Sequence, residues 1–393
     1  MPTTAPLVLG HRGASGYLPE HTLAAYELAA RQGADHLELD LVPTRDGVLV
    51  ARHENDIWGT TDVADHPELA ARRRRAVVDG KEVDGVFTED LTLEELRTVR
   101  ARERLPALRG TEHDGEWPVP TFAEIIELRA RLSDELGRRI GLYVELKHPT
   151  HLAAAGLPLE ERMLADLEAG GLLGEEGREA VWVQCFEPGS LRTLRERLGS
   201  PLRQVLLATA FDDVPADLVA AGERRTYAEL LSPEGLRGLE GVLTGVGPSR
   251  TMVLPRTPEG ALGEPTSLVA DAHTAGLVVH AWTFRAENRF LPTPLRSTGP
   301  DGSPGPDRQH GDLAAEVRAH LAAGVDGIFT DHPDLVVQAV RDPRASGAER
   351  SLRRRRRRCR TCRPSRRAGG TSPPRPWRPA GRSRRGRRAS AAP

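Results

Sequence analysis

The chain has 393 residues with 55 basic and 56 acidic side chains, a formal net charge of −1. The charges are segregated: residues 351–393 hold 17 arginines and no acidic residue, so residues 1–350 carry a net charge of −18. An acidic body would repel phosphate backbones, which excludes a general nucleic-acid binder. Three cysteines exclude a disulfide scaffold, and no apolar run approaches the roughly 18 residues that a membrane span needs.

Short apolar runs alternate with helical patterns along the chain. The runs predict strands over 7–13, 36–42, 140–147, 181–186, 203–209, 241–249, 277–284 and 327–331, and helical periodicity is present over 22–32, 122–132 and 159–169. Residues 44–53 predict a hairpin that turns at Asp46-Gly47. Eight strands that alternate with helices predict a closed (β/α)8 TIM barrel, with a doubly wound open sheet as the alternative.

Three stretches depart from this alternation. Residues 54–118 are polar and predict a segment inserted after the second strand and its hairpin. Residues 291–311 are rich in Pro and Gly and predict a long loop, a candidate lid. From residue 345 the chain is rich in Arg, Pro, Gly and Ser without apolar periodicity, which is typical of disorder. We therefore expect one barrel domain over 1–344 and a disordered basic tail over 345–393.

The two ends of the chain bear on location and partners. The start, MPTTAPLVLG, has no basic segment and a short apolar stretch, so it does not resemble a signal peptide. The expected location is cytoplasmic, or extracytoplasmic if the start has been assigned too late. The Arg-, Pro-, Ser- and Gly-rich composition of the tail is also what translation of a GC-rich reading frame without selected function would produce. The most we expect from it is weak contact with an anionic surface.

Two of the predicted strands each carry a pair of charged residues, and three of these four residues are carboxylates. Glu38 and Asp40 lie two residues apart, and so do Glu145 and Lys147. Strand periodicity places each pair on one face, where two carboxylates repel unless a cation or proton lies between them. Three carboxylates are hard oxygen ligands suited to Ca²⁺ or Mg²⁺ rather than to Zn²⁺.

Histidines and a further cation complete the set. His11-Arg12-Gly13 closes the first strand, and His53 ends the hairpin strand. The carboxyl ends of barrel strands converge on the catalytic face, so all these groups should meet in one cleft. A hard cation with Arg12 and Lys147 could neutralise a phosphate, and two histidines could serve as general acid and base. The set is suited to cleaving a phosphodiester.

These residues lie in motifs that resemble a known family. HRGASGYLPEHTLAAYELAARQGADHLELDLVPTRDGVLVARHE (11–54) closely resembles the opening signature of glycerophosphodiester phosphodiesterases. The segments YVELK, HAWTF and GVDGIFTDHPD are similar to its later strand motifs, and the resemblance covers about residues 7–340. PEHT, TDVADHPE and RAENRFLP resemble the long, periplasmic-type branch. The basic tail has no counterpart in the family.

The resemblance implies an activity. Such hydrolases convert glycerophosphodiesters, such as glycerophosphocholine and glycerophosphoethanolamine, to sn-glycerol 3-phosphate and an alcohol. The glycerol hydroxyl is thought to attack phosphorus, and water then opens the cyclic phosphate.

Motif positions imply a role for each candidate residue. Glu38, Asp40 and Glu145 would hold the metal, Ca²⁺ in the similar branch, with Mg²⁺ as the alternative. His11 and His53 would be the acid–base pair. The substrate would be bound by Arg12, Lys147, Glu20 and Trp282, with Glu20 supporting the metal or His11 and Trp282 packing against the glycerol or leaving group.

Two other functions remain open at this point. One is a related lipid phosphodiesterase of the sphingomyelinase D or phosphoinositide phospholipase type; PEHT, His53 and the ELK strand favour glycerophosphodiesters. The other is an Arg-tailed binding protein on a degenerate barrel, which the intact set of charged residues and histidines argues against. We expect His36 and His148 to be structural.

Overall fold

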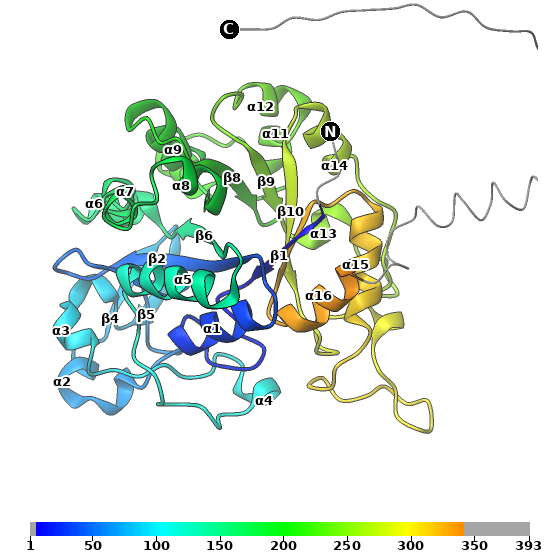
Figure 1. Ribbon diagram of the computed structural model, residues 1–393, viewed down its shortest axis with the longest axis horizontal. Coiled ribbons are helices and arrows are strands. Elements are labelled where there is room, and N and C mark those ends of the chain that lie inside the picture. Colours follow the sequence, from blue (N-terminus) through cyan, green and yellow to red (C-terminus); the bar gives the residue numbers. More distant parts are fainter. Residues whose placement is uncertain (1–4, 342–393) are drawn as a thin grey trace, which may run out of the picture. The chain divides into compact units, whose positions relative to one another are not determined.

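Eight parallel strands close into a barrel in the computed structural model, which describes residues 5–341 (Figure 1). Strand β1 pairs with both β2 and β11, which closes the sheet and makes the open-sheet alternative wrong. The predicted TIM barrel is confirmed. Its strands are β1 (Leu7–Gly10), β2 (His36–Pro43), β6 (Gly141–Leu146), β7 (Val181–Cys185), β8 (Arg203–Ala208), β9 (Gly245–Pro248), β10 (Val278–Phe284) and β11 (Gly327–Thr330).

Helices cover the outside of the barrel. The predicted helices correspond to α1 (Leu23–Arg31), α5 (Phe122–Leu136) and α7 (Glu160–Ala169). Helix α5 begins at a capping box, in which Thr121 and Glu124 bond each other's backbone N–H groups, and ends at Gly137 in the left-handed conformation. The other helices are α6 (Pro149–Ala154), α8 (Glu175–Ala180), α9 (Pro188–Arg192), the π-helix η3 (Thr193–Arg197), α10 (Ala216–Ala220), α11 (Tyr227–Leu230), α12 (Pro233–Arg237), α13 (Arg250–Val253), α14 (Leu268–Thr274), α15 (Leu313–Ala322) and α16 (Pro333–Arg341).

A segment is inserted between the hairpin strand β3 (Leu49–Ala51) and α5. Its elements are η1 (Val63–Asp65), α2 (Pro67–Ala70), β4 (Arg74–Val78), β5 (Lys81–Gly85), η2 (Thr88–Asp90), α3 (Leu93–Leu96) and α4 (Pro106–Arg109), gathered at one side of the barrel (Figure 1). Strand β3 runs antiparallel to β2, as the hairpin prediction required. Val42 and Val50 on these strands pack with Ile57, Val86 and Val99 in a small core that joins the segment to the barrel.

Apolar side chains fill part of the interior of the barrel. Leu9, Tyr143, Trp182, Val205 and Phe329 form a separate apolar cluster there. The rings of Tyr143 and Trp182 stack with centroids 5.7 Å apart. Because these side chains fill the interior of the barrel, a ligand reaches the polar strand residues from the carboxyl ends of the strands.

The first strand is shorter than predicted. It ends at Gly10, because Arg12 and Gly13 adopt positive φ angles of 57° and 86° and turn the chain. A Cβ on Gly13 would lie 2.6 Å from the backbone of Ala25, so glycine is required there. The turn places His11 and Arg12, both buried, at the carboxyl end of β1.

Two further expectations concern a loop and the tail. The loop between β10 and α15 contains η4 (Thr293–Leu295), and no residue of 291–311 lines the cavity described below, so the lid interpretation is not supported. Within residues 5–341, no helix is both long and apolar enough to cross a membrane. The predicted disordered tail, 345–393, lies outside the described residues.

Candidate active site

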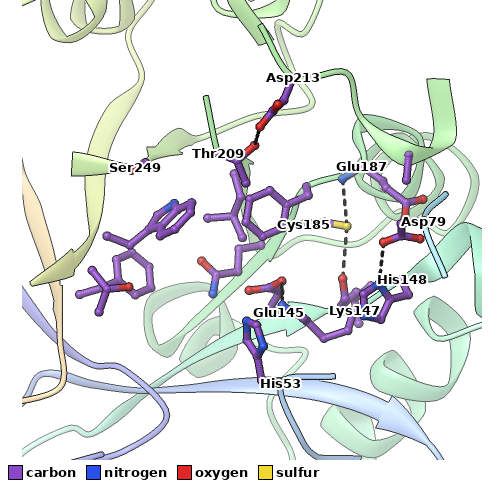
Figure 2. Close-up of a pocket in the computed structure, with 18 of the residues that line it drawn as sticks. His53, Asp79, Glu145, Lys147, His148, Cys185, Glu187, Thr209, Asp213 and Ser249 are labelled. Atoms are coloured by element: carbon purple, nitrogen blue, oxygen red, sulfur yellow. Dashed lines mark hydrogen bonds and ion pairs between the residues drawn. The ribbon is translucent and has the colours of Figure 1, made fainter. Parts of the chain in front are cut away.

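A cavity of about 680 Å³ lies at the carboxyl ends of the barrel strands. Seven of the nine predicted site residues line it: His11, Arg12, Glu38, His53, Glu145, Lys147 and Trp282. Figure 2 shows His53, Glu145 and Lys147 together on one side, with Thr209 and Asp213 across from them. Seven residues that the sequence singled out therefore gather at one cavity, whose lining also includes unpredicted side chains such as Asp79, Cys185 and Glu187.

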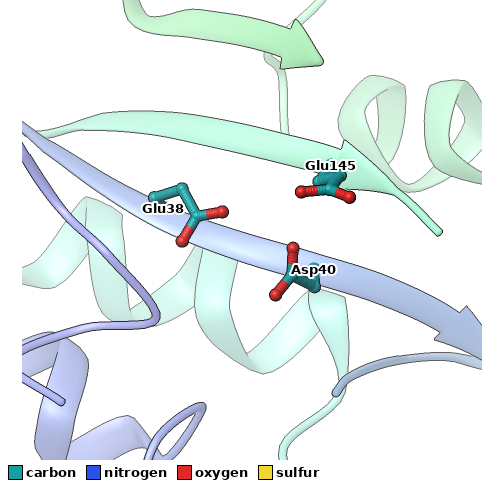
Figure 3. A group of neighbouring side chains, drawn as sticks. All are labelled: Glu38, Asp40 and Glu145. Atoms are coloured by element: carbon teal, nitrogen blue, oxygen red, sulfur yellow. The ribbon is translucent and has the colours of Figure 1, made fainter. Parts of the chain in front are cut away.

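The three predicted metal ligands form a cluster at its inner end. Glu38 and Asp40 on β2 and Glu145 on β6 point toward one another (Figure 3), with one oxygen of each within 4.8 Å of the others. Asp40 is in register with Glu145 because β2 and β6 pair in parallel. All three are buried, and alternation along the two strands turns them to the same side.

The carboxyl groups of the cluster differ in their pKa values. Against the effect of burial, Lys147 and His21 hold the pKa of Asp40 well below its usual value. Burial, together with Asp40 and Glu145, raises the pKa of Glu38 well above its usual value. Burial also raises the pKa of Glu145 to about 8, although Lys147 opposes this. The buried Oδ1 atom of Asp40 has no hydrogen-bond partner among the described residues. Three clustered carboxyl groups, one with an unpartnered oxygen, offer the oxygen ligands that a hard divalent cation prefers.

His11 is held by a carboxylate behind it. Its Nδ1 lies 2.6 Å from Oδ1 of Asp331, the residue that follows β11. Despite burial, Arg285, Arg109 and His11 keep the pKa of Asp331 well below its usual value, so Asp331 is an ionised acceptor. Burial and then Arg12 lower the pKa of His11 to about 4. A neutral His11 that donates from Nδ1 leaves a lone pair on Nε2, which lies 3.4 Å from Oγ1 of Thr283.

His53 has the same arrangement. Its Nδ1 lies 2.5 Å from Oε1 of the neighbouring Glu54, and the pKa of Glu54 is lowered by His53 and Arg104 against the effect of burial. Desolvation and the cations Arg12 and Lys147 lower the pKa of His53 to about 3. Two neutral imidazoles, each backed by a carboxylate, therefore face one cavity.

Two cations lie beside the carboxylate cluster. Nζ of Lys147 donates to Oε1 of Glu145 at 2.7 Å and lies 3.9 Å from Oδ1 of Asp40. The backbone N–H of Arg12 donates to Glu38 at 2.7 Å, and its Nε lies 3.6 Å from Oδ2 of Asp40. The strained turn at Arg12 thus aims a backbone donor at the cluster. Both cations can attract a phosphate.

Two predicted residues do not line the cavity. Asp40 lies in the cluster but beneath the surface of the cavity. Glu20 is buried and accepts hydrogen bonds from Arg12 and Arg104. The contacts of its carboxylate are therefore with two arginines rather than with His11 or the cluster, so the expected support is indirect, through Arg12. Trp282 lines the cavity as predicted, with Nε1 donating to the carbonyl of Gly247 and its ring edge-to-face with Phe186.

Other site residues were not predicted. His21, in the PEHT motif, contacts Oδ2 of Asp40 at 2.8 Å, and Gln184 on β7 donates to Glu38 at 3.0 Å. Gln184 is a polar residue in an apolar strand, the same signal that singled out Glu145, and the two are in register. Asp331 directly follows the last strand, β11, and could have been found by the rule that strand ends carry site residues. His36 is buried and does not line the cavity, whereas His148, which we expected to be structural, lines it and pairs with Asp79.

The fold and the site together define a class of protein: a TIM barrel with histidines, cationic side chains and a carboxylate cluster gathered at the carboxyl ends of its strands. The family follows from sequence comparison. The model of the Glycerophosphoryl diester phosphodiesterase family matches residues 11–335, and the chain belongs to that family. It is an enzyme of the phosphoric diester hydrolase class.

Individual relatives agree with this assignment. A glycerophosphodiester phosphodiesterase of Arabidopsis thaliana is 34% identical over 340 residues, which cover 84% of each chain. One of Haemophilus influenzae is 27% identical over 355 residues, 85% of this chain and 90% of the relative. A solved structure of a putative family member from Silicibacter pomeroyi shares the fold with a TM-score of 0.58 at 23% identity, covering 87% of this chain and 95% of that one.

Proposed function

We propose that the protein hydrolyses glycerophosphodiesters, such as glycerophosphocholine and glycerophosphoethanolamine, to sn-glycerol 3-phosphate and an alcohol. The observation that carries this proposal is one cavity lined by two carboxylate-backed histidines, two cations and a carboxylate cluster. An Oleispira antarctica phosphodiesterase with the same fold (TM-score 0.52, 19% identity, 86% of this chain and 97% of that one) was solved in complex with the product sn-glycerol-3-phosphate. The activity would place the protein in glycerol and lipid metabolism.

His11 and His53 are the proposed acid–base pair. One imidazole accepts the proton of the attacking glycerol hydroxyl as its oxygen bonds to phosphorus. The other donates a proton to the alcohol oxygen as the bond from phosphorus to that oxygen breaks. In the second stage the two exchange roles while water opens the cyclic phosphate. An anionic substrate beside these neutral groups raises their pKa values and so makes a protonated partner accessible.

Glu38, Asp40 and Glu145 would hold a divalent cation, Ca²⁺ as first choice and Mg²⁺ as the alternative. Such a cation, when bound, supplies Lewis-acid stabilisation of the phosphoryl oxygens. Arg12 and Lys147 would neutralise the phosphate from the protein side.

The remaining predicted residues have supporting roles. Trp282 would pack against the glycerol or the leaving group from the wall of the cavity. Glu20 would act through Arg12, whose guanidinium it holds at 2.9 Å. The alternative lipid phosphodiesterase is not favoured, because the family match covers residues 11–335 and the relatives bear the glycerophosphodiester name.

The proposal is tested by assaying a panel of glycerophosphodiesters with an enzymatic readout for glycerol 3-phosphate, with Ca²⁺ and with excess chelator. Sphingomyelin, lysophosphatidylcholine and a phosphoinositide serve as comparison substrates. The proposal requires turnover of the glycerophosphodiesters in the presence of the cation. Turnover confined to the lipids would favour the alternative function.

A further inference from the structure

Each candidate catalytic histidine is backed by a carboxylate, and each of these carboxylates is bonded by an arginine of the inserted segment, 54–118. Asp331 behind His11 accepts from Arg109, and Glu54 behind His53 accepts from Arg104. The segment therefore contacts His53 directly through its first residue, Glu54, and reaches His11 through Asp331. The two arginines that hold these carboxylates are only five residues apart in the sequence.

Arg109, the last residue of α4, joins three loops around His11. Its NH2 donates to Oδ2 of Asp331 at 2.6 Å, its Nε to Glu287 at 2.7 Å and its NH1 to the carbonyl of Ser15 at 2.7 Å. The side chain is only 8% exposed. Ser15 lies in the loop after β1, Glu287 in the loop after β10, and Asp331 directly after β11. A single guanidinium therefore connects the segments that follow three neighbouring barrel strands around His11.

Arg104 makes the equivalent contacts near His53. Its Nε and NH2 bind both oxygens of Glu20, and its NH1 and NH2 bind both oxygens of Glu54 at 3.0 and 2.6 Å. Glu20 in turn holds Arg12. One guanidinium thus links the carboxylate behind His53 to the carboxylate that orients a phosphate-binding cation.

We propose that the inserted segment completes the active site by supplying Arg104 and Arg109 as positioning residues for the two histidines. Only the planar fork of an arginine offers enough fixed donors to reach two or three acceptors at once. By fixing an ionised carboxylate against Nδ1, each arginine selects the tautomer whose Nε2 faces the cavity. The inference rests on the proposed function and adds to it a catalytic use for the insertion.

The test replaces each arginine by alanine and measures kcat and KM for glycerophosphocholine. We expect kcat to fall about 10- to 100-fold in both variants, the usual effect of losing a partner that orients a reactive group. KM should stay nearly unchanged in Arg109→Ala and should rise in Arg104→Ala, because Arg104 also holds the Glu20 carboxylate that orients Arg12. Because Arg285 also donates to Asp331, at 2.7 Å, the loss in Arg109→Ala should report position rather than the charge of Asp331.

Two matched controls separate positioning from attachment of the segment. Arg97→Ala removes an ion pair between the segment and α5 at Glu124, and Arg256→Ala removes one to the buried Glu316. Within the described residues, neither arginine contacts Asp331 or Glu54, the carboxylates that bond His11 and His53. Both variants should therefore keep wild-type kcat. Thermal melts establish that every variant is folded. If Arg109→Ala does not fold, Arg109→Lys, which keeps the charge without the fork, should show the same loss of kcat.

A double variant provides the readout that a purely structural role would not give. If Arg109 acts through Asp331, Arg109→Ala should cost little further activity in an Asp331→Asn background. Wild-type kcat in folded Arg104 and Arg109 variants, equal losses in the controls, or losses that multiply with Asp331→Asn would each overturn the inference. An inactive wild-type protein would instead refute the proposed function itself.

Discussion

Replacement of Lys147 by arginine tests whether the site needs a compact ammonium group. Nζ of Lys147 lies between Glu145, at 2.7 Å, and Asp40, at 3.9 Å, and the side chain is 5% exposed. Although burial alone would lower it, Glu145 and Asp40 raise the pKa of Lys147, so the group is charged. The chain contains 53 arginines and only one other lysine, Lys81, which makes a lysine at this position informative.

The size of the effect follows from the contacts. An ammonium group has three donors, and Glu145 takes one, which leaves donors for a bound phosphate. The guanidinium of Lys147→Arg keeps the charge but is longer and planar, and the ring of Phe186 lies 5.7 Å from Nζ. Loss of one charge-assisted hydrogen bond costs about 1.5–3 kcal/mol, so kcat/KM should fall roughly 10- to 150-fold while the protein stays folded.

The assay measures kcat/KM for glycerophosphocholine and the melting temperature of Lys147→Arg, Lys147→Ala and, as a control, Arg75→Lys. Arg75 is exposed on β4 and does not line the cavity, so its replacement by lysine should leave kinetics unchanged. Lys147→Arg should lose much of the activity that Lys147→Ala loses. Wild-type kinetics in Lys147→Arg would refute the argument, and Lys147 would then be a strand-end residue that pairs with Glu145.

Three further predictions concern the histidines, the metal and pH. His11→Ala and His53→Ala should each lower kcat on the order of 10²–10⁴, and the double variant should lose less than the product, because both serve one cycle of proton transfer; steady-state kinetics decide this. Removal of divalent cations by a chelator should abolish turnover and lower the melting temperature, because the clustered carboxylates then repel one another. Addition of Ca²⁺ should restore both turnover and melting temperature. Full activity in a metal-free protein would contradict the proposed metal role. Burial lowers the pKa of His36 from 6.5 to about 3, so between these values the unfolded chain binds a proton that the folded chain does not, and acidification destabilises the fold. In denaturant titrations, His36→Leu should lessen the loss of unfolding free energy between pH 7 and pH 5 by about 2 kcal/mol, and an unchanged pH dependence would show that His36 is not the group responsible.

The parts of the site that the sequence predicted are those set by local rules. Alternation along β2 and β6 placed Glu38, Asp40, Glu145 and Lys147 on one side, and barrel topology brought their strands together. The helix over 122–132 followed from apolar periodicity, and α5 extends it to Leu136.

The parts that were missed depend on contacts between distant residues. Arg104 and Arg109 contact carboxylates 84, 178 and 222 residues away, and no local pattern in the polar insertion distinguishes them from its other arginines. The strand prediction over 7–13 was too long, because β1 ends at Gly10 and the chain turns at Arg12 and Gly13 with positive φ angles. Glu20 was assigned to the metal or His11, but its nearest cations are arginines, one of them from the insertion.

The most direct test of the account is the identity of the products. Incubation of the Ca²⁺-loaded wild-type protein with glycerophosphocholine, followed by phosphorus NMR, should show sn-glycerol 3-phosphate as the phosphorus-containing product, with choline released in equal amount. The His11→Ala protein should give almost none in the same time. Phosphocholine and glycerol as products, or no turnover by a folded and metal-loaded wild-type protein, would contradict the account.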